Sequence, residues 1–214
     1  MKYQKILLLS FLLCIGCGTS QPVRVLQEGK TEAALSLGGP LIKFGGATIP
    51  MPYLTVGAIH GYKENVTLVA NAHLLSAALG DIGLDAGAAT RLVKQDNVIP
   101  EVTAKALLYF FDNLSRGPNQ PRLFPMISFN ASYTIGESSL AYVGFDNIFQ
   151  LSSPGLIISP FIGTEFYISN KFSGQIEAKW YAANVNSAHG IYEGYASVGG
   201  NGNIGLLFGL VYNF

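Results

Sequence analysis

A serine, a histidine and a glutamate lie close together in a polar stretch near the C-terminal end of the chain. They are Ser187, His189 and Glu193, and Ser197 follows shortly afterwards. A serine deprotonated by a histidine that a carboxylate orients can hydrolyse an ester through an acyl-enzyme. Spacing alone fixes no triad geometry, and serine is an ordinary loop residue. An enzyme that hydrolyses envelope-lipid esters is therefore kept as an alternative, and no catalytic residue is assigned.

Most other charged side chains fall on one face of extended, alternating segments. Arg91 is predicted to face Glu101 on the next segment, and His73 to lie diagonal to Asp85. Buried charges need partners, so these residues predict an ion-pair network that fills a narrow interior. The alternative is a narrow, ion-permeable channel. The predicted interior set is Glu32, His73, Asp85, Arg91, Glu101, Lys105, Glu165, Glu177 and Lys179.

Metal and cofactor chemistry have little support in the sequence. His60 and His73 are predicted to lie on opposite faces of neighbouring strands, so they do not share a metal ion. No nucleotide-binding glycine motif and no metal-ligand spacing is present. We therefore expect no metal and no cofactor. A net charge of zero also argues against a nucleic-acid partner.

The first residues have the features of an export signal. Lys2 and Lys5 precede an apolar run over residues 6–15, which is shorter than the about 20 residues that a membrane-spanning helix needs. The sequence Cys14-Ile15-Gly16-Cys17 resembles a lipobox, with Cys14 in place of the usual leucine. The resemblance implies a signal peptide over residues 1–16, a lipid on Cys17 and a periplasmic tether over residues 17–29. The alternative is an ordinary signal peptide cut near residues 18–20, without lipid.

The composition favours a membrane protein built from strands. Charged residues make up only 12% of the chain, about half the usual share, and there are 25 glycines. A soluble domain with so few charges has difficulty covering its surface with polar groups. No later segment is continuously apolar for the about 18 residues of a membrane helix. A closed barrel is then the structure compatible with a membrane.

Alternation of apolar and polar residues predicts an all-β fold over residues 30–214. We expect an antiparallel up-and-down transmembrane β-barrel of about ten strands, within a range of 8–12. A soluble barrel with its faces reversed is the main competitor, but its outer face would need many charges. The predicted strands are Lys30–Gly38, Pro52–Tyr62, Val66–Ala78, Ile82–Leu92, Glu101–Phe111, Phe124–Ile135, Leu140–Phe145, Leu156–Tyr167, Phe172–Ala182 and Asn203–Phe214.

The last of these strands carries a family resemblance. It reads NIGLLFGLVYNF, with apolar residues at alternate positions and an aromatic residue, Phe214, at its end. This resembles the terminal strand of Gram-negative outer-membrane β-barrels, whose final aromatic residue is an assembly signal. With the Gly38-Gly39-Pro40 turn and the stretch Gly45 to Pro52 that follows it, most of the mature chain resembles uncharacterised barrel lipoproteins of Gram-negative bacteria. The resemblance implies an outer-membrane location and, as partners, outer-membrane lipid and the barrel assembly machinery.

The lengths of the predicted connections alternate, except for a tight turn after the third strand near Gly80 and Asp81, and this alternation sets an orientation. Short connections follow the second, fourth, sixth and eighth strands, as periplasmic turns do in transmembrane barrels. Both chain ends are then expected in the periplasm, with a rim of aromatic residues at each interface; Tyr53, Phe110, Phe124 and Trp180 belong to the outer rim. A structural or interaction role follows, with an envelope protein complex or surface polysaccharide contacting the long loops Gly39–Met51, Asp112–Leu123, Asp146–Gly155 and Ala183–Gly202.

Overall fold

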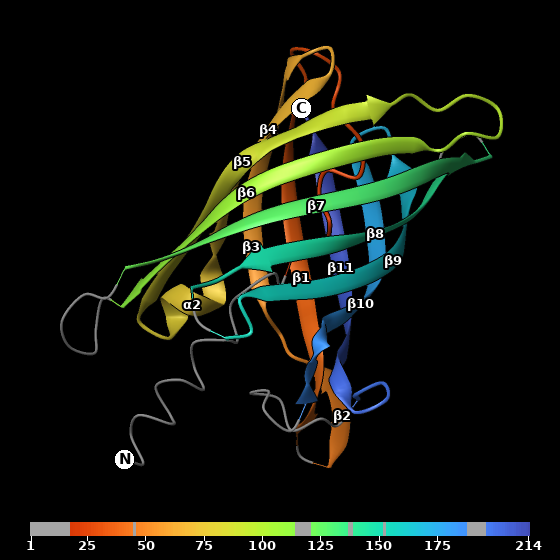
Figure 1. Cartoon of the computed structure of the whole chain (residues 1–214). Helices are drawn as coiled ribbons and strands as arrows, with labels where there is room; N and C mark the ends of the chain where they lie inside the picture. Colours follow the sequence, from red (N-terminus) through yellow and green to blue (C-terminus); the bar gives the residue numbers. More distant parts are fainter. Residues whose placement is uncertain (1–17, 45, 114–120, 137–138, 152, 188–195) are drawn as a thin grey trace.

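The fold is a closed antiparallel barrel, seen here in a computed structural model that describes residues 18–44, 46–113, 121–136, 139–151, 153–187 and 196–214. Eleven strands and one short helix, α2, are present in these ranges (Figure 1). The elements are β1 (Thr31–Phe44), β2 (Ala47–Pro50), β3 (Leu54–Lys63), β4 (Val66–His73), α2 (Leu74–Ala78), β5 (Asp81–Val93), β6 (Glu101–Asn113), β7 (Arg122–Ile135), β8 (Ser139–Phe149), β9 (Leu156–Ser169), β10 (Phe172–Asn186) and β11 (Asn201–Asn213).

Ten of the described strands form the barrel wall. Each pairs antiparallel with its neighbour in the chain, from β1 and β3 through to β11. The last strand then pairs with the first, with Leu35 opposite Leu210 and Leu37 opposite Phe208, and this closes the sheet. The all-β, antiparallel, up-and-down barrel predicted from the sequence is confirmed. No helix in the described part of the chain is long and apolar enough to span a membrane.

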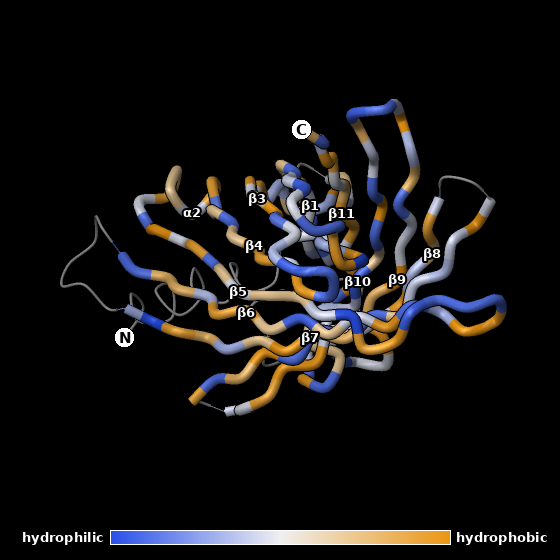
Figure 2. Tube along the Cα trace, turned by 90° about the horizontal axis from the view of Figure 1, so that it is seen from above, coloured by the Kyte–Doolittle hydropathy of each residue, from blue (hydrophilic) through white to orange (hydrophobic). Residues whose placement is uncertain are grey.

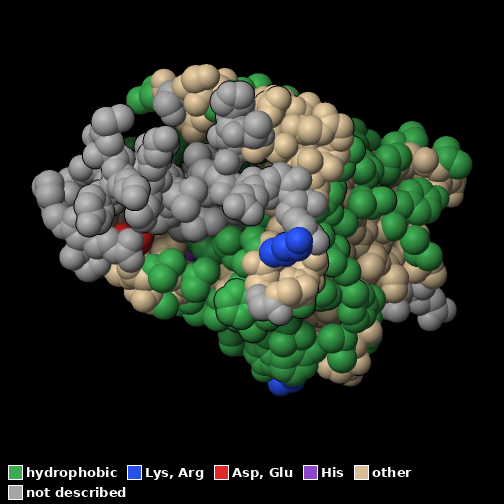
Figure 3. Space-filling view, turned by 90° about the horizontal axis from the view of Figure 1, so that it is seen from below, with side chains coloured by type: hydrophobic (Ala, Val, Ile, Leu, Met, Phe, Trp, Pro, Cys, Tyr) green, Lys and Arg blue, Asp and Glu red, His purple; other side chains and the backbone are tan. Residues whose placement is uncertain are grey.

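Large apolar side chains cover the outside of the wall. Side chains alternate between the two faces of a strand, so one residue in two points outward, and Figure 2 shows this alternation of hydropathy along the tube. Seen from below, hydrophobic side chains cover much of the outer wall (Figure 3). Every barrel strand contributes at least one exposed apolar side chain: Leu35, Leu37, Val56, Leu68, Leu84, Leu108, Ile127, Val143, Phe145, Ile162, Ile176 and Phe208.

Three segments differ from the sequence-based expectation. Residues expected in a loop extend β1 to Phe44 and pair it with β2, so a hairpin replaces the loop there. The predicted third strand ends at His73, and helix-favouring leucines and alanines continue as α2. Strand β8 continues to Phe149, which places Asp146 in the wall instead of in a loop. For β1 and β8, pairing with neighbouring strands extends the element beyond its predicted end.

The interior near α2 is filled by a hydrophobic cluster. Tyr53 and Phe124, predicted at the outer aromatic rim, lie inside this cluster with 0% and 7% of their surface exposed. The prediction was wrong because both occupy inward positions of the alternation. The other members are Val69, Leu107, Tyr109, Phe111, Met126, Ile148 and Ile157. The rim at the opposite end does carry outward aromatic rings, with Tyr212 packed 5.1 Å from Phe172 and 5.0 Å from Phe214 between ring centroids.

Candidate functional site

Residues 18–26 run inside the barrel and residues 27–29 are exposed at its end, where the sequence suggested a tether outside it. Near the end that carries the chain's last residue, the amide of Gly29 donates to the carbonyl of Gly61 (2.8 Å). A Cβ on Gly61 would lie 2.1 Å from the carbonyl oxygen of Gln27, so only glycine allows this close approach. Val23 has 1% of its surface exposed. We call residues 18–29 the luminal segment; Figure 1 draws its first residues in red.

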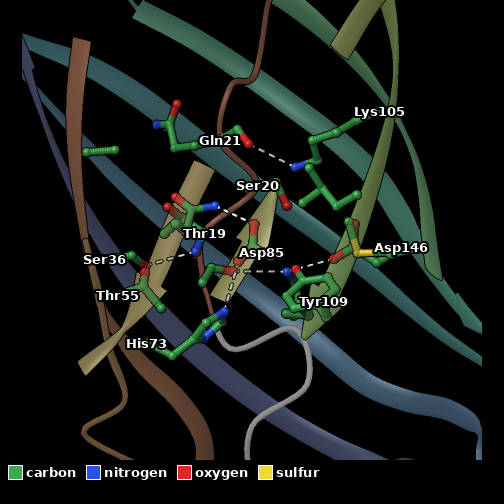
Figure 4. Close-up of a pocket in the computed structure, with 16 residues that line it drawn as sticks. Thr19, Ser20, Gln21, Ser36, Thr55, His73, Asp85, Lys105, Tyr109 and Asp146 are labelled. Carbon is green, nitrogen blue, oxygen red and sulfur yellow. Dashed lines mark hydrogen bonds and ion pairs between the residues drawn. The ribbon is translucent and has the colours of Figure 1, made fainter. Parts of the chain in front are cut away.

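Side chains of the wall bind the backbone of the luminal segment. Lys105 Nζ donates to the carbonyl of Gln21 (3.0 Å), and Lys179 Nζ donates to that of Gly18 (3.3 Å). Asn130 Nδ2 donates to the carbonyl of Val23 (2.6 Å). Figure 4 shows Lys105 reaching Gln21 from the opposite side of the cavity to Ser36. Three strands, β6, β7 and β10, thus supply donors to one extended peptide.

Backbone amides of the luminal segment donate to the wall in return. The amide of Ser20 donates to Glu177 Oε2 (2.9 Å), and the amide of Thr19 donates to Ser36 Oγ (2.9 Å). The amide of Leu26 donates to Thr67 Oγ1 (2.7 Å). Donors and acceptors of the wall therefore match those of the peptide backbone along most of the segment, as buried polar groups require.

Arg24 fixes the middle of the luminal segment through its side chain. Its Nε donates to Ser132 Oγ (2.8 Å) and its Nη1 to Thr134 Oγ1 (2.9 Å), both on β7. Its Nη2 donates to the Ser132 carbonyl (3.2 Å) and to Gln95. The planar guanidinium offers donors in a fixed fork, so one side chain holds several acceptors at once.

A buried ion cluster lies beside this segment. Lys179 Nζ is 2.9 Å from Asp146 Oδ2 and 3.1 Å from Glu177 Oε1. Tyr142 donates its hydroxyl to Glu177 Oε2 (3.1 Å). Asp146 was not among the predicted interior residues, because it was expected in a loop. It lies two residues after Gly144 and four after Tyr142, and this two-residue spacing would have indicated the same inward face. Lys105, also buried, supplies a second cation nearby.

His73 and Asp85 form a second polar cluster, closer to α2. Their Nε2 and Oδ2 atoms are 2.8 Å apart, and Asn71 Nδ2 donates to the other carboxylate oxygen (2.7 Å). The second ring nitrogen of His73 lies 2.9 Å from the Tyr53 hydroxyl, which is 3.0 Å from Ser76 Oγ. The contacts run from Asp85 through His73 and the Tyr53 hydroxyl to Ser76, and they join α2 to the wall.

The structure places the remaining predicted interior residues as follows. Arg91 Nε lies 3.5 Å from Glu101 Oε2. Glu32 and Glu165 are partly buried at inward positions of β1 and β9. No group of three or more histidine, cysteine, aspartate or glutamate side chains suited to a metal ion occurs among the described residues.

Of the four residues considered for hydrolysis, the structure describes Ser187 and Ser197. Ser187 Oγ donates to the carbonyl of Gly200 (2.8 Å), and Ser197 is partly exposed. His189 and Glu193 lie outside the described residues, as does Cys17, the predicted lipidation site. Phe214, the predicted assembly signal, is 75% exposed at the end of the barrel.

The fold is similar to known outer-membrane barrels, while no family model and no curated protein sequence matches the chain. Outer membrane protease OmpT of Escherichia coli is 14% identical, with a TM-score of 0.43 over 86% of this chain and 97% of that one. The translocator domain of autotransporter NalP of Neisseria meningitidis is 12% identical, with a TM-score of 0.42 over 100% and 95%. An outer membrane channel of Pseudomonas putida F1 is 12% identical, with a TM-score of 0.43 over 91% and 98%. At 12–14% identity, the similarity concerns the fold and not an activity.

Proposed function

We propose that the protein is an outer-membrane β-barrel whose lumen is closed and whose role is structural or interactive. The observation that carries this proposal is the belt of exposed apolar side chains on all ten barrel strands. Exposed apolar patches above a few hundred Å² are rare on soluble monomers, whereas a lipid-facing wall requires them. The ten barrel strands have 8 to 15 residues, and β4 is the shortest of them. A tilted strand needs about 9–11 residues to cross a bilayer, so these lengths suit a transmembrane barrel.

The filled interior supports a closed barrel over an open channel. The luminal segment occupies the polar half of the lumen, and the hydrophobic cluster that contains Tyr53 and Phe111 fills the part near α2. Lys105 and Lys179 bind the segment, Asp146 and Glu177 lie within ion-pair distance of Lys179, and Arg91 lies 3.5 Å from Glu101, as buried charges require. The long connections at the α2 end, among them the β1–β2 hairpin, are then the surface offered to an envelope protein or a polysaccharide.

The position of the chain ends is part of the same proposal. The end of β11 and the short turns share one side of the barrel, which we assign to the periplasm. There Phe214 is available to the assembly machinery. Lipid on Cys17 also stays a proposal. The residues that follow it, Gly18 to Gln21, lie within the lumen, so a lipid there would be joined to the barrel by a buried linker rather than by a free tether.

Membrane fractionation and gel migration test this function. We expect the protein in the outer-membrane fraction, running compact before boiling and more slowly afterwards, as a detergent-stable barrel does. In a planar bilayer the full chain should show no large unit conductance. Recovery in the soluble periplasm without a heat-dependent shift would mean that the apolar face holds no lipid. A large conductance would reject the closed lumen instead.

Hydrolysis of envelope-lipid esters is the alternative function, and it is tested separately through His189. Replacing His189 by Ala should leave the acylation of lipid A unchanged, as measured by mass spectrometry of the extracted lipid. A loss of acyl chains that depends on His189 would establish the enzyme function.

A further inference from the structure

We propose that residues 18–26 are a removable plug, and that the barrel interior is a binding site for an extended polypeptide. In this structure the chain supplies that polypeptide itself. The inference rests on the proposed membrane barrel, because only a closed wall makes an enclosed binding site. It adds a ligand class, an extended peptide backbone, that the proposed function does not contain.

The contacts are those of peptide recognition. Six wall side chains bind backbone atoms of the segment: Ser36, Thr67, Lys105, Asn130, Glu177 and Lys179. Main-chain hydrogen bonds hold extended peptides irrespective of most side chains, while a few side-chain contacts select the sequence. In the luminal segment the side chains that would select the peptide sequence are those of Arg24 and Gln21. Gln21 Nε2 donates to Gln175 Oε1 (2.7 Å), and Arg24 donates to Ser132.

The plug is separate from the wall. The ladder closes between β1 and β11 without it, and β1 pairs on its other edge with β3. Residues 18–29 belong to no strand of the described sheet, and the hydrogen bond from the Gly29 amide to the Gly61 carbonyl joins the end of the segment to β3. The plug connects to β1 after Gly29, whose φ of 78° is a conformation that glycine adopts readily and that suits a hinge.

The fit of the plug is incomplete, as a removable ligand requires. Among the described residues, the hydroxyl oxygens of Thr19 and Ser20 are buried without a hydrogen-bond partner. A cavity of about 30 Å³ adjoins both residues and reaches His73, Asp85 and Lys105 (Figure 4). That volume holds at least one water molecule. Water in that cavity would bond these two hydroxyls in place of wall side chains, so this part of the plug is held through solvent and not by direct contact with the wall.

Thiol labelling of the full chain tests whether the plug occupies the lumen. In a chain with Cys14 and Cys17 replaced by serine, Val23→Cys places a thiol on the buried plug. Glu28→Cys places one on the exposed end of the same segment. A membrane-impermeant thiol reagent should label Val23→Cys at least a hundredfold more slowly than Glu28→Cys. Equal labelling rates in a barrel that retains its heat-dependent gel shift would overturn the proposal.

Deletion of residues 18–29 tests whether the plug is removable. The shortened barrel should keep its heat-dependent shift and bind a fluorescent synthetic peptide of residues 18–29 with one-to-one stoichiometry. Lys105→Met, which removes the donor to the Gln21 carbonyl, should weaken that binding at least tenfold. Lys171→Met, at an exposed lysine on the β9–β10 turn, should leave it unchanged.

The outcomes separate the two proposals. Loss of the heat-dependent shift in the shortened chain alone would show that the segment is part of the folded wall and not a plug. A folded, shortened barrel that binds no peptide would overturn the binding site. Absence of the shift in the full chain would contradict the membrane barrel itself.

Discussion

Removing the side chain of Arg24 should loosen the luminal segment without unfolding the barrel. Arg24→Met keeps the aliphatic stem and deletes the guanidinium, which donates to two hydroxyls and a carbonyl of β7 and to Gln95. A hydrogen bond that involves a charged group contributes about 1.5–3 kcal/mol. The side chain is only partly buried, and bonds sharing one group are not additive. We therefore expect a total loss of about 3 kcal/mol.

The thiol at Val23→Cys reports this loss directly. If the plug opens and closes faster than the reagent reacts, the labelling rate follows the population of the open form. A loss of about 3 kcal/mol then raises the rate roughly a hundredfold. Lys30→Met removes the same charge from an exposed position six residues later and should leave the rate unchanged. If Arg24→Met labels as slowly as the parent, the guanidinium contacts do not hold the plug in place.

Three further predictions concern the wall. Ile127→Lys, on the outward face of β7, should lower the free energy of unfolding of the barrel in lipid by about 2–4 kcal/mol, whereas Ile135→Lys at the strand end should lower it by about 0–1 kcal/mol. Urea unfolding in vesicles measures both values. Equal values for the two variants would contradict a lipid-facing belt. Gly87→Val should lower the temperature at which heating changes the gel migration of the barrel, because a Cβ on Gly87 would lie 1.9 Å from the Ala106 carbonyl oxygen. Ala88→Val, on the outward face, should have little effect. The same temperature in both variants would mean that the wall adjusts to a side chain at position 87. Phe214→Ala should reduce the amount of heat-shifted barrel in cells, measured against total protein on immunoblots, and undiminished assembly would remove Phe214 as the signal.

Local patterns were sufficient for the wall. Because side chains alternate with period two, the sequence of β7 alone places Ile127 outward and Ser128 inward. Short turns between neighbouring strands then fix the register. The contact of His73 with Asp85 was predicted with a tight turn near Gly80 and Asp81, and it is present although α2 joins the two strands instead. The same rule, extended by a few residues along β8, points Asp146 inward, and only its assumed place in a loop concealed it.

The contents of the lumen required the tertiary structure. Residues 18–29, reading GTSQPVRVLQEG, have no sustained alternation and no helical period, so nothing local distinguishes a plug from a tether. Their partners, from Ser36 to Lys179, lie 17–161 residues away along the chain. Tyr53 and Phe124 were placed at a rim for a similar reason, since aromatic residues at strand ends suit either face.

The sequence by itself determined which side of each strand faces outward, because that depends only on the two-residue period and on where apolar residues stand. The tertiary structure alone decided what fills the barrel, because an enclosed polar wall exists only after β1 and β11 have paired. Until then Lys105, Glu177 and Lys179 are solvated, and the luminal segment has no binding site. Closure removes these groups from water, and they then exchange hydrogen bonds with water for hydrogen bonds with the peptide backbone.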